Sequence, residues 1–333
     1  MSRAAEVVAR PNSLSRLALF LGLIFQLVLP AWSFGSRSQD QDLLSLQEAQ
    51  KYMLELINRD RESQGVPAVT LDTAATAAAQ GHSDEMAQWN YISHWDKQGR
   101  KPDQRYSEAG GHGAVFENVY TNHDVPFYGS QTPLAADQNF PRREIEKAQA
   151  WFLNSDGHRG NVFDRNHNRV GIGLSFSIDK KYGSRITVAQ EFVNEFVSLA
   201  DAPQEFVSGH RSRIAGHIGK DVSLQAVQIC REAMPKAMTV SDLKRTTSYN
   251  LPNESVTTCY PQPYRSPVPV SLTKTAEGEE FSLVVQPNAS WSDGLYYVIV
   301  WVRKPDSAEA FIGSTRTVRL SSGSQIGQIA AAL

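Results

Sequence analysis

The chain of 333 residues has 33 Lys and Arg against 35 Asp and Glu, a formal net charge of -2 and 41% hydrophobic residues. This length allows roughly two domains, each large enough to bury a core. The near-neutral charge balance argues against nucleic acid or an anionic membrane surface as the main partner, because both select a basic excess. We therefore expect a globular protein that binds no nucleic acid.

The N-terminus has the pattern of a secretory signal. Three arginines precede an apolar run over residues 17–30, and Ala31 and Ser33 are the small residues that signal peptidase prefers. We interpret residues 1–33 as a cleaved signal peptide. A retained anchor is the alternative, but the run is shorter than the roughly 20 residues of a membrane span, and Pro30 interrupts its end. We expect a secreted protein, extracellular or periplasmic, with no stable membrane span after cleavage.

The first half of the chain has the periodicity of helices. Asp42 is placed to cap a helix that ends at Gly65, and Asp72 to cap an alanine-rich helix over residues 73–89. A third helix over residues 142–153 ends in the turn Asn-Ser-Asp-Gly, which presents His158 at the end of an element. Alternating patterns predict strands at residues 116–120, 170–176 and 187–197, a hairpin at 179–184 and an insertion at 122–140.

The second half changes to β-favouring segments after a linker at residues 201–203. Strands are expected at residues 222–230, 268–272, 281–285, 295–302 and 310–320. Short strands at regular spacing predict a small all-β sandwich-like domain. The expected organisation is a signal peptide at 1–33, a first domain at 42–198, a C-terminal β domain at 205–320 and a tail at 321–333.

Cys230 and Cys259 are the only cysteines, and both fall in the predicted β domain. In an oxidising compartment we expect them to form one disulfide.

Four ordered blocks of the first domain resemble a known family. They are Leu56-Ile57-Asn58 to Leu71-Asp72, Ala79 to Met86 with Ser93-His94, Glu117-Asn118-Val119, and Trp151 with Asn154 to Asn161 and Gly171-Ile172-Gly173. In this order they are similar to the CAP superfamily of cysteine-rich secretory proteins, venom antigens and pathogenesis-related proteins, and above all to its bacterial SCP-like extracellular branch. The resemblance implies an α+β fold: an α-β-α sandwich with helices on both faces of a central antiparallel sheet, followed here by the β domain.

The resemblance also implies a ligand-binding cleft. Its members are His94, Glu117 and His158, with Asn154 and His82 beside them. Family members that bind zinc or another divalent ion use two histidines and two glutamates there. In this chain Asn154 and Ser155 stand where the second glutamate would be, so the implied metal ligands are His94, Glu117 and His158.

These three groups suit two kinds of site. Two imidazoles and one carboxylate with an open position match a catalytic zinc site, whereas the same groups can form a hydrogen-bonded cluster in a wet cleft. The sequence lacks both a His-Glu-x-x-His helix and a Gly-x-Ser-x-Gly elbow, which disfavours a standard metalloprotease and serine chemistry.

Other conspicuous residues have simpler interpretations. We expect Arg159 to form a salt bridge rather than bind a substrate anion. Three loop histidines are expected to be solvated, namely His112, His123 and His167. Four aromatic residues of the β domain are expected to pack against neighbouring strands, with a carbohydrate platform as the alternative: Trp291, Tyr296, Tyr297 and Trp301.

We predict a secreted CAP-domain protein whose cleft binds a lipid, a peptide or a cell-envelope component, with Zn²⁺ or another divalent cation as the cofactor to be tested. One alternative is an extracellular metal-dependent hydrolase that uses His94 and His158, with Glu117 as ligand or base. Another is an adhesion protein that acts through its C-terminal β domain. The sequence does not decide whether the protein is an enzyme.

Overall fold

The computed structural model describes residues 43–123, 139–179, 183–199 and 202–321. The predicted signal peptide, most of the predicted insertion, part of the linker, and the tail beyond Ser321 lie outside these residues. Residues 43–194 are called the N-terminal part of the chain and residues 197–321 the C-terminal part.

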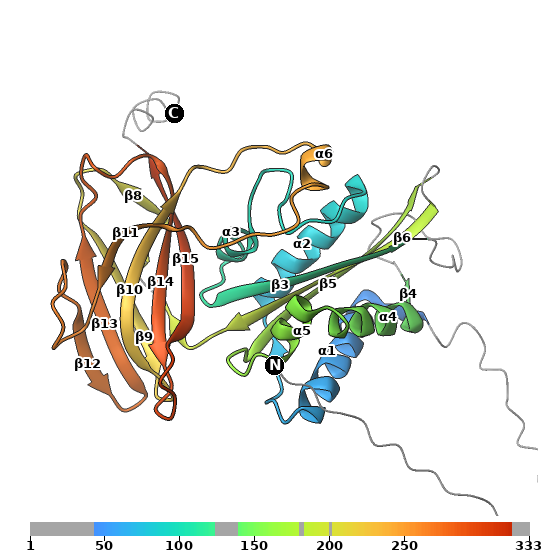
Figure 1. Ribbon diagram of the computed structural model, residues 1–333, viewed down its shortest axis with the longest axis horizontal. Helices are drawn as coiled ribbons and strands as arrows, with labels where there is room; N and C mark the ends of the chain where they lie inside the picture. Colours follow the sequence, from blue (N-terminus) through green and yellow to red (C-terminus); the bar gives the residue numbers. More distant parts are fainter. Residues whose placement is uncertain (1–42, 124–138, 180–182, 200–201, 322–333) are drawn as a thin grey trace, which may run out of the picture. The chain divides into compact units, whose positions relative to one another are not determined.

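A four-stranded sheet forms the centre of the N-terminal part (Figure 1). Its order is β2 (Thr70–Leu71), β5 (Arg169–Asp179), β6 (Gly183–Asn194) and β3 (Ala114–His123). Strands β5, β6 and β3 are antiparallel, whereas the short β2 runs parallel to β5. Strand β3 is therefore an edge strand, and the candidate site lies along it.

Helices cover both faces of this sheet (Figure 1). One face carries α1 (Leu46–Ser63), α4 (Arg142–Leu153) and α5 (Asp156–Phe163), and the other carries α2 (Thr73–Trp89) and α3 (Pro102–Glu108). Strand β6 explains the division, because its side chains alternate. Val188 and Phe192 join the core beneath α1 and α4, whereas Ala189 and Val193 face α2 and α3. This α-β-α arrangement confirms the predicted α+β fold.

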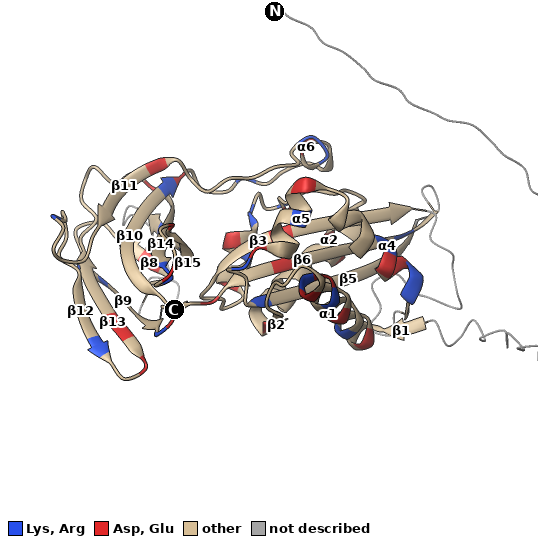
Figure 2. Ribbon diagram, turned by 60° about the horizontal axis from the view of Figure 1, so that its bottom comes forward, with Lys and Arg blue, Asp and Glu red and all other residues tan. Residues whose placement is uncertain are grey.

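The start of α1 differs from the prediction. Ser45 caps the helix rather than Asp42: its side chain accepts from the backbone N–H of Glu48, and the Glu48 carboxylate accepts from the N–H of Ser45. Residues Leu43–Ser45 form strand β1, which pairs with β4 (Asn139–Pro141). Charges of both signs then follow along α1, as Figure 2 shows.

Helix α2 approaches β5 so closely that only glycine fits. A Cβ atom on Gly173 would lie 2.2 Å from the carbonyl oxygen of Ala79, and one on Gly171 would lie 2.1 Å from the carbonyl carbon of Ala75. The alanine-rich face of α2 supplies the other half of this contact. The two glycines therefore set the distance between helix and sheet, and with it the position of residues that follow α2.

The C-terminal part is a β-sandwich (Figure 1). One sheet has the order β11 (Glu254–Cys259), β10 (Ser223–Glu232), β14 (Gly294–Arg303), β15 (Phe311–Ser321) and β8 (Glu205–Val207). The other has the order β12 (Ser271–Thr275), β13 (Gly278–Val285), β9 (Ser212–Gly219) and β7 (Val197–Ser198). Val298 and Val300 of β14 point into the core between the sheets, whereas Tyr297 and Ile299 point outward. The sandwich agrees with the predicted strand pattern, although the predicted strands omitted β8, β9 and β11.

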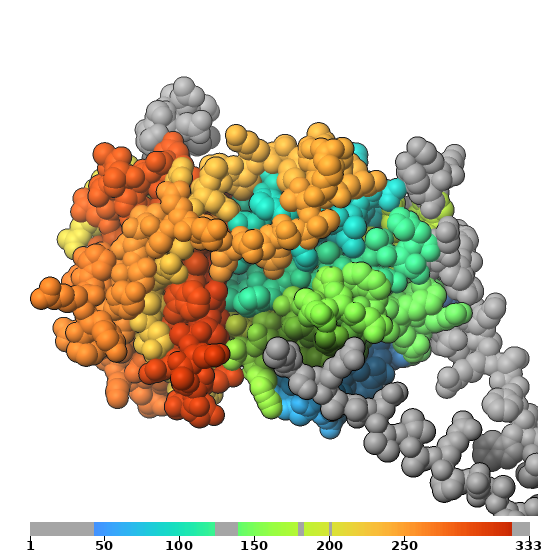
Figure 3. Space-filling view, viewed as in Figure 1, coloured from blue at the N-terminus to red at the C-terminus, as the bar shows by residue number. Residues whose placement is uncertain are grey.

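A long connection between β10 and β11 crosses the N-terminal part. We call residues 233–253 the strap; it includes the short helix α6 (Val240–Leu243). The backbone N–H of Met238 donates to the carbonyl oxygen of Lys97, and the indole N–H of Trp95 donates to the carbonyl oxygen of Ser248. Figure 3 shows the strap, in gold, lying over the cyan surface near α2.

The predicted disulfide between Cys230 and Cys259 is wrong: both residues are free, buried thiols. In the ladder between β10 and β11, Cys230 lies opposite Ser255 and Cys259 lies opposite Val227. Four residues of strand separate Ser255 from Cys259, or about 13 Å, and a disulfide needs Cα atoms within about 7 Å. Cys259 also faces the sandwich core, whereas Cys230 packs on the outer face of the sheet.

Among the described residues, none of the helices is long and apolar enough to cross a membrane.

Replacing Gly173 with alanine tests the contact between α2 and β5. The added Cβ forces the helix away from the sheet, so Gly173→Ala lowers the free energy of unfolding by about 1–3 kcal/mol in urea titration. Gly81 is the matched control, because it lies on α2 with open space around it. Gly81→Ala raises stability by up to about 1 kcal/mol. Equal effects of the two changes would show that the approach is not tight.

Thiol titration tests the cysteine assignment. Denatured, non-reduced protein is expected to present two thiols, because the two sulfur atoms cannot meet in the fold. Titration of the folded protein over minutes should detect far less reactive thiol, since both cysteines are buried. Absence of reactive thiol after denaturation would contradict the strand register described above.

Candidate functional site

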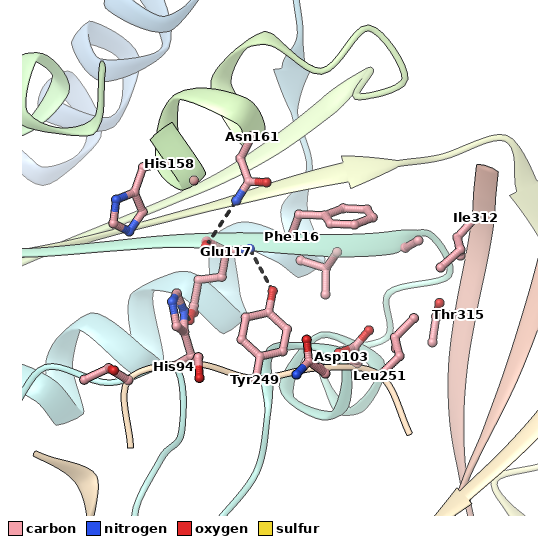
Figure 4. A pocket seen from close by; sticks show the side chains of 16 residues that line it. His94, Asp103, Phe116, Glu117, His158, Asn161, Tyr249, Leu251, Ile312 and Thr315 are labelled. Carbon is pink, nitrogen blue, oxygen red and sulfur yellow. Dashed lines mark hydrogen bonds and ion pairs between the residues drawn. The ribbon is translucent and has the colours of Figure 1, made fainter. Parts of the chain in front are cut away.

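A cavity of about 380 Å³ lies along the free edge of β3 (Figure 4). The N-terminal part supplies the histidines, acids and strand residues: His94, Asp103, Ala114, Val115, Phe116, Glu117, Gly157, His158 and Asn161. The strap and β15 supply the remaining wall: Thr247, Ser248, Tyr249, Asn250, Leu251, Ile312 and Thr315. The site is therefore built by both parts of the chain.

Glu117 is the charged centre of the site. Its side chain is fully buried, and one oxygen accepts from the Arg105 guanidinium at 2.6 Å while the other accepts from Nδ1 of His94 at 2.9 Å. Burial opposes ionisation, but Arg105, together with the imidazoles of His82 and His94, lowers the pKa of Glu117 to about 2. Glu117 is thus a buried anion whose charge is paired with the guanidinium of Arg105.

His94 is the group that this ion pair presents to the cavity. Its Nδ1 is held by Glu117, and its ring lies 5.0 Å from the ring of Tyr249. The carboxylate thereby orients the imidazole, leaving Nε2 as the ring nitrogen that can serve a ligand.

His82 stands behind the site rather than in it. It is buried on α2, its Nε2 hydrogen bonds with the carbonyl oxygen of Ser93 at 2.8 Å, and it lies 3.9 Å from Glu117. Burial, with the charge of Arg105, lowers its pKa to about 4. His82 is therefore neutral at pH 7 and packs against the ion pair between Arg105 and Glu117.

A second buried glutamate lies beside the first. Glu191 on β6 is directly opposite Glu117 in the ladder, and within the described part of the chain neither of its oxygens has a hydrogen-bond partner. Burial and the charge of Glu117 raise the pKa of Glu191 well above its ordinary value, although Arg105 acts in the opposite direction. One guanidinium thus lies near two carboxyl groups: it pairs directly with Glu117, and the raised pKa favours the protonated form of Glu191.

His158 reaches the cavity from the other side of β3, as Figure 4 shows. It lies on α5, where the sequence predicted only a turn; Nδ1 contacts Oγ of Ser155 at 2.8 Å, and the ring packs 4.9 Å from Trp151. Burial and the nearby His94 lower the pKa of His158. The side chain of Glu117 is directed to His94, on the opposite side of the strand from His158.

Asn154 does not take the place expected of it. It is the C-cap of α4 and is exposed, and the described cavity wall does not include it. Ser155 contacts His158 instead. Asn161, one turn along α5 from His158, supplies the amide of the site: it donates to the backbone carbonyl of Glu117 at 3.4 Å.

The backbone of Glu117 faces the cavity. Its N–H donates to the hydroxyl of Tyr249 at 3.2 Å, and its carbonyl accepts from Asn161. Both are edge groups that another strand would pair with if β3 were interior. The side chains of Tyr249 and Asn161 therefore occupy hydrogen-bonding positions that the backbone of a neighbouring strand would otherwise take.

Two residues of the site escaped sequence analysis. Arg105 lies on α3, a helix that the sequence analysis did not predict; Pro102 at the first helical position was the available signal. Tyr249 is 132 positions from Glu117 in the sequence, and we find no local signal that would have revealed its role.

Three further predictions had different outcomes. Arg159 forms a surface salt bridge with Asp156 at 2.5 Å, as expected. His112 and His123 are exposed, as expected. His167 is buried, contrary to prediction: it hydrogen bonds with Asn194 at 2.6 Å and stacks on Phe192, so a loop position did not imply solvation.

The donors around Glu117 do not fit a divalent ion. Both carboxylate oxygens are engaged, and Arg105 already places a positive charge at 2.6 Å, where a second cation would be repelled. Within residues 43–123, 139–179, 183–199 and 202–321, no three His, Cys, Asp or Glu side chains are grouped as a metal site.

Residues 54–193 match the model of the cysteine-rich secretory protein (CAP) family. This match bears out the predicted resemblance to the CAP family for the N-terminal part of the chain. The chain is similar to the uncharacterized protein YkwD of Bacillus subtilis, with 25% identity over 129 residues; the match covers 39% of this chain and 43% of that protein.

Two solved structures are also similar. One is an extracellular protein of Bacillus anthracis that contains an SCP domain, with 21% identity and a TM-score of 0.32, over 45% of this chain and 43% of that chain. The other is an outer surface protein of Borrelia burgdorferi, with 14% identity and a TM-score of 0.33, over 46% of this chain and 96% of that chain.

The two glutamates should make stability respond to pH in opposite ways. The folded pKa of Glu117 is lowered, so its contribution is present above the unfolded value of 4.5 and is lost as pH falls toward about 2. The folded pKa of Glu191 is raised, so its contribution is present below 4.5 and is lost as pH rises. Glu191→Gln, which keeps the neutral shape, should therefore gain stability relative to wild type as the pH rises from about 4 to about 7.

Urea unfolding at several pH values measures this difference, with Glu117→Gln as the matched control. That variant should lose stability at neutral pH, because it strands the buried charge of Arg105. If wild type and Glu191→Gln keep a constant difference across the range, Glu191 is ionised in the fold and the assignment is wrong.

Proposed function

We propose that this CAP-domain protein binds an extended peptide segment in the cavity, by backbone pairing with the edge of β3. The observation that carries the proposal is the backbone of Glu117, whose N–H and carbonyl both face the cavity and are satisfied by side chains alone. An exposed strand edge is the element that an added peptide strand pairs with.

The geometry around that edge supports a short segment. Val115 lies two residues before Glu117 and also lines the cavity, so its backbone groups face the same side. This part of the edge spans about 7 Å, and the limited volume of the cavity suits a few residues of extended chain rather than a folded domain. His94 and His158 flank the edge and supply side-chain hydrogen bonds.

Tyr249 has a specific part in this proposal. In the free protein its hydroxyl accepts from the N–H of Glu117, which a peptide carbonyl would take over. Binding must therefore displace that hydroxyl, and the strap that carries it limits access to the cavity. The hydrogen bond between Tyr249 and Glu117 stabilises the free state. Because it must be broken, it makes the free energy of peptide binding less favourable by the same amount.

We propose that binding does not need a metal. The ion pair between Arg105 and Glu117 already neutralises the carboxylate that a cation would use. The role of Glu117 is then to hold His94 in orientation through the 2.9 Å contact. Under this proposal the binding site contains neither zinc nor another divalent ion.

A hydrolase remains the second candidate, and one observation favours it. A buried carboxylate that orients an imidazole toward a cavity is the arrangement of a general base, with Glu117 and His94 in those roles. Such a base would activate a water molecule against a bound peptide. Binding and turnover use the same two residues, so only product formation separates them.

We further propose that the protein acts outside the cytoplasm, exported by the signal at residues 1–33. The support is the basic, then apolar, then small-residue pattern of that segment. An envelope peptide would be a ligand available in that compartment.

A random heptapeptide library displayed on phage tests the binding function. Peptides enriched on the purified protein are synthesised with a fluorescent label and titrated by fluorescence polarisation. Tyr249→Phe should bind them about tenfold more tightly, because the N–H of Glu117 is left unpaired in the free variant. His94→Ala should bind them more weakly.

Tyr52→Phe is the matched control, since it removes a tyrosine hydroxyl that contacts Glu146 on the helical surface; its affinity should equal that of wild type. Metal analysis of protein purified without chelators should detect no stoichiometric zinc. Failure to enrich any peptide, or equal affinity of wild type and Tyr249→Phe, would reject pairing at β3. Zinc that disappears in the double variant His94→Ala, His158→Ala would reject the metal-free site.

A further inference from the structure

A second cavity lies on the outer face of the five-stranded sheet. Its volume is about 500 Å³, and among the described residues none lines both this cavity and the one at β3. The aromatic and polar side chains that define it are Gln225, Gln228, Thr258, Tyr260, Tyr264 and Trp301. We call these six residues the aromatic groove.

The groove exposes two tyrosine rings that lie against each other. Tyr264 is 70% exposed and Tyr260 is 40% exposed, and their rings meet edge to face at 6.4 Å. Trp301 lies on β14 in the same groove and is partly buried. By contrast, Tyr296 and Tyr297 on the same strand are fully buried, whereas Trp301 packs only in part against the cluster that contains Tyr297 and also lines the groove.

The polar side chains of the groove are neutral and held in place. The indole N–H of Trp301 donates to Oε1 of Gln228 at 3.0 Å, and Gln228 lies opposite Thr258 in the ladder. A ring anchored in this way keeps its orientation when a ligand arrives, which lowers the entropy cost of binding. The lining residues described for this cavity carry no charge, so it selects neither anions nor cations.

Flat aromatic rings interleaved with amides and a hydroxyl are complementary to a sugar. The C–H face of a pyranose packs on an aromatic ring, while its hydroxyls need both donors and acceptors, which Gln and Thr side chains provide. A proline-rich peptide also uses aromatic grooves, but its backbone offers only acceptors, which leaves half of these polar groups unused.

From this chemistry we infer that the aromatic groove binds a neutral oligosaccharide of pyranose units. Such a site goes beyond the peptide site at β3 and does not depend on it. It gives the C-terminal part a function of its own, in which the sandwich attaches the protein to a glycan.

Isothermal titration of the intact protein tests the inference with cellohexaose and chitohexaose, which separate a glucose from an N-acetylglucosamine ligand. At least one should bind with a dissociation constant of about 1 mM or tighter. Tyr264→Ala and Trp301→Ala should each weaken it about tenfold. Tyr264 is exposed enough that its replacement leaves the thermal midpoint unchanged, so this variant reports on binding even if Trp301→Ala is destabilised.

Trp89→Ala is the matched control, because Trp89 is 44% exposed on α2, outside the groove; it should bind as wild type does. Decaproline serves as the competing ligand. The inference is overturned if neither sugar binds, if decaproline binds in their place, or if Tyr264→Ala binds the sugar as tightly as wild type does.

Discussion

The buried ion pair between Arg105 and Glu117 is the interaction on which the site depends. A carboxylate that is fully buried must be paired, since an isolated charge in the interior costs several kcal/mol. Arg105 provides that charge from α3, and the same guanidinium also donates to the carbonyl oxygen of His94. Arg105 therefore connects strand β3, helix α3 and the loop that carries His94.

This pairing also decides the chemistry of the neighbouring groups. Burial and the charge of Glu117 across the ladder raise the pKa of Glu191, and His94 is oriented by its hydrogen bond with Glu117 rather than left to rotate. The guanidinium of Arg105 supplies the positive charge that pairs with Glu117. The site thus offers an oriented imidazole and a strand edge. Together they suit a peptide whose backbone can form hydrogen bonds with that edge.

The C-terminal part contributes to that site as well as carrying the aromatic groove. The strap reaches over α2 and α3, and Tyr249 contacts the edge of β3. Lys101, buried on the N-terminal part, pairs with Glu232 at 2.6 Å and donates to the carbonyl oxygen of Asn250 on the strap. Whether residues 205–320 fold as an independent domain stays a prediction, since these contacts cross the proposed boundary.

Local sequence determined much of the first half of the fold. The helices over Thr73–Trp89 and Arg142–Leu153 have the predicted bounds, because alanine content, periodicity and capping act within a few residues. The order of motifs identified the CAP family and named His94, Glu117 and His158, all of which line one cavity.

Other features were decided only by the tertiary structure. The identity of the partner of Glu117, the placement of Tyr249 and the burial of His167 depend on which segments meet across many residues, and no local pattern encodes that meeting. The cysteines show the same limit, because their pairing depends on strand register rather than on their proximity in sequence. Sequence alone determined most of the longer elements and the three candidate groups. Long-range packing decided which of those groups touch, because burial forces each charge and each backbone edge to find a partner wherever the fold provides one.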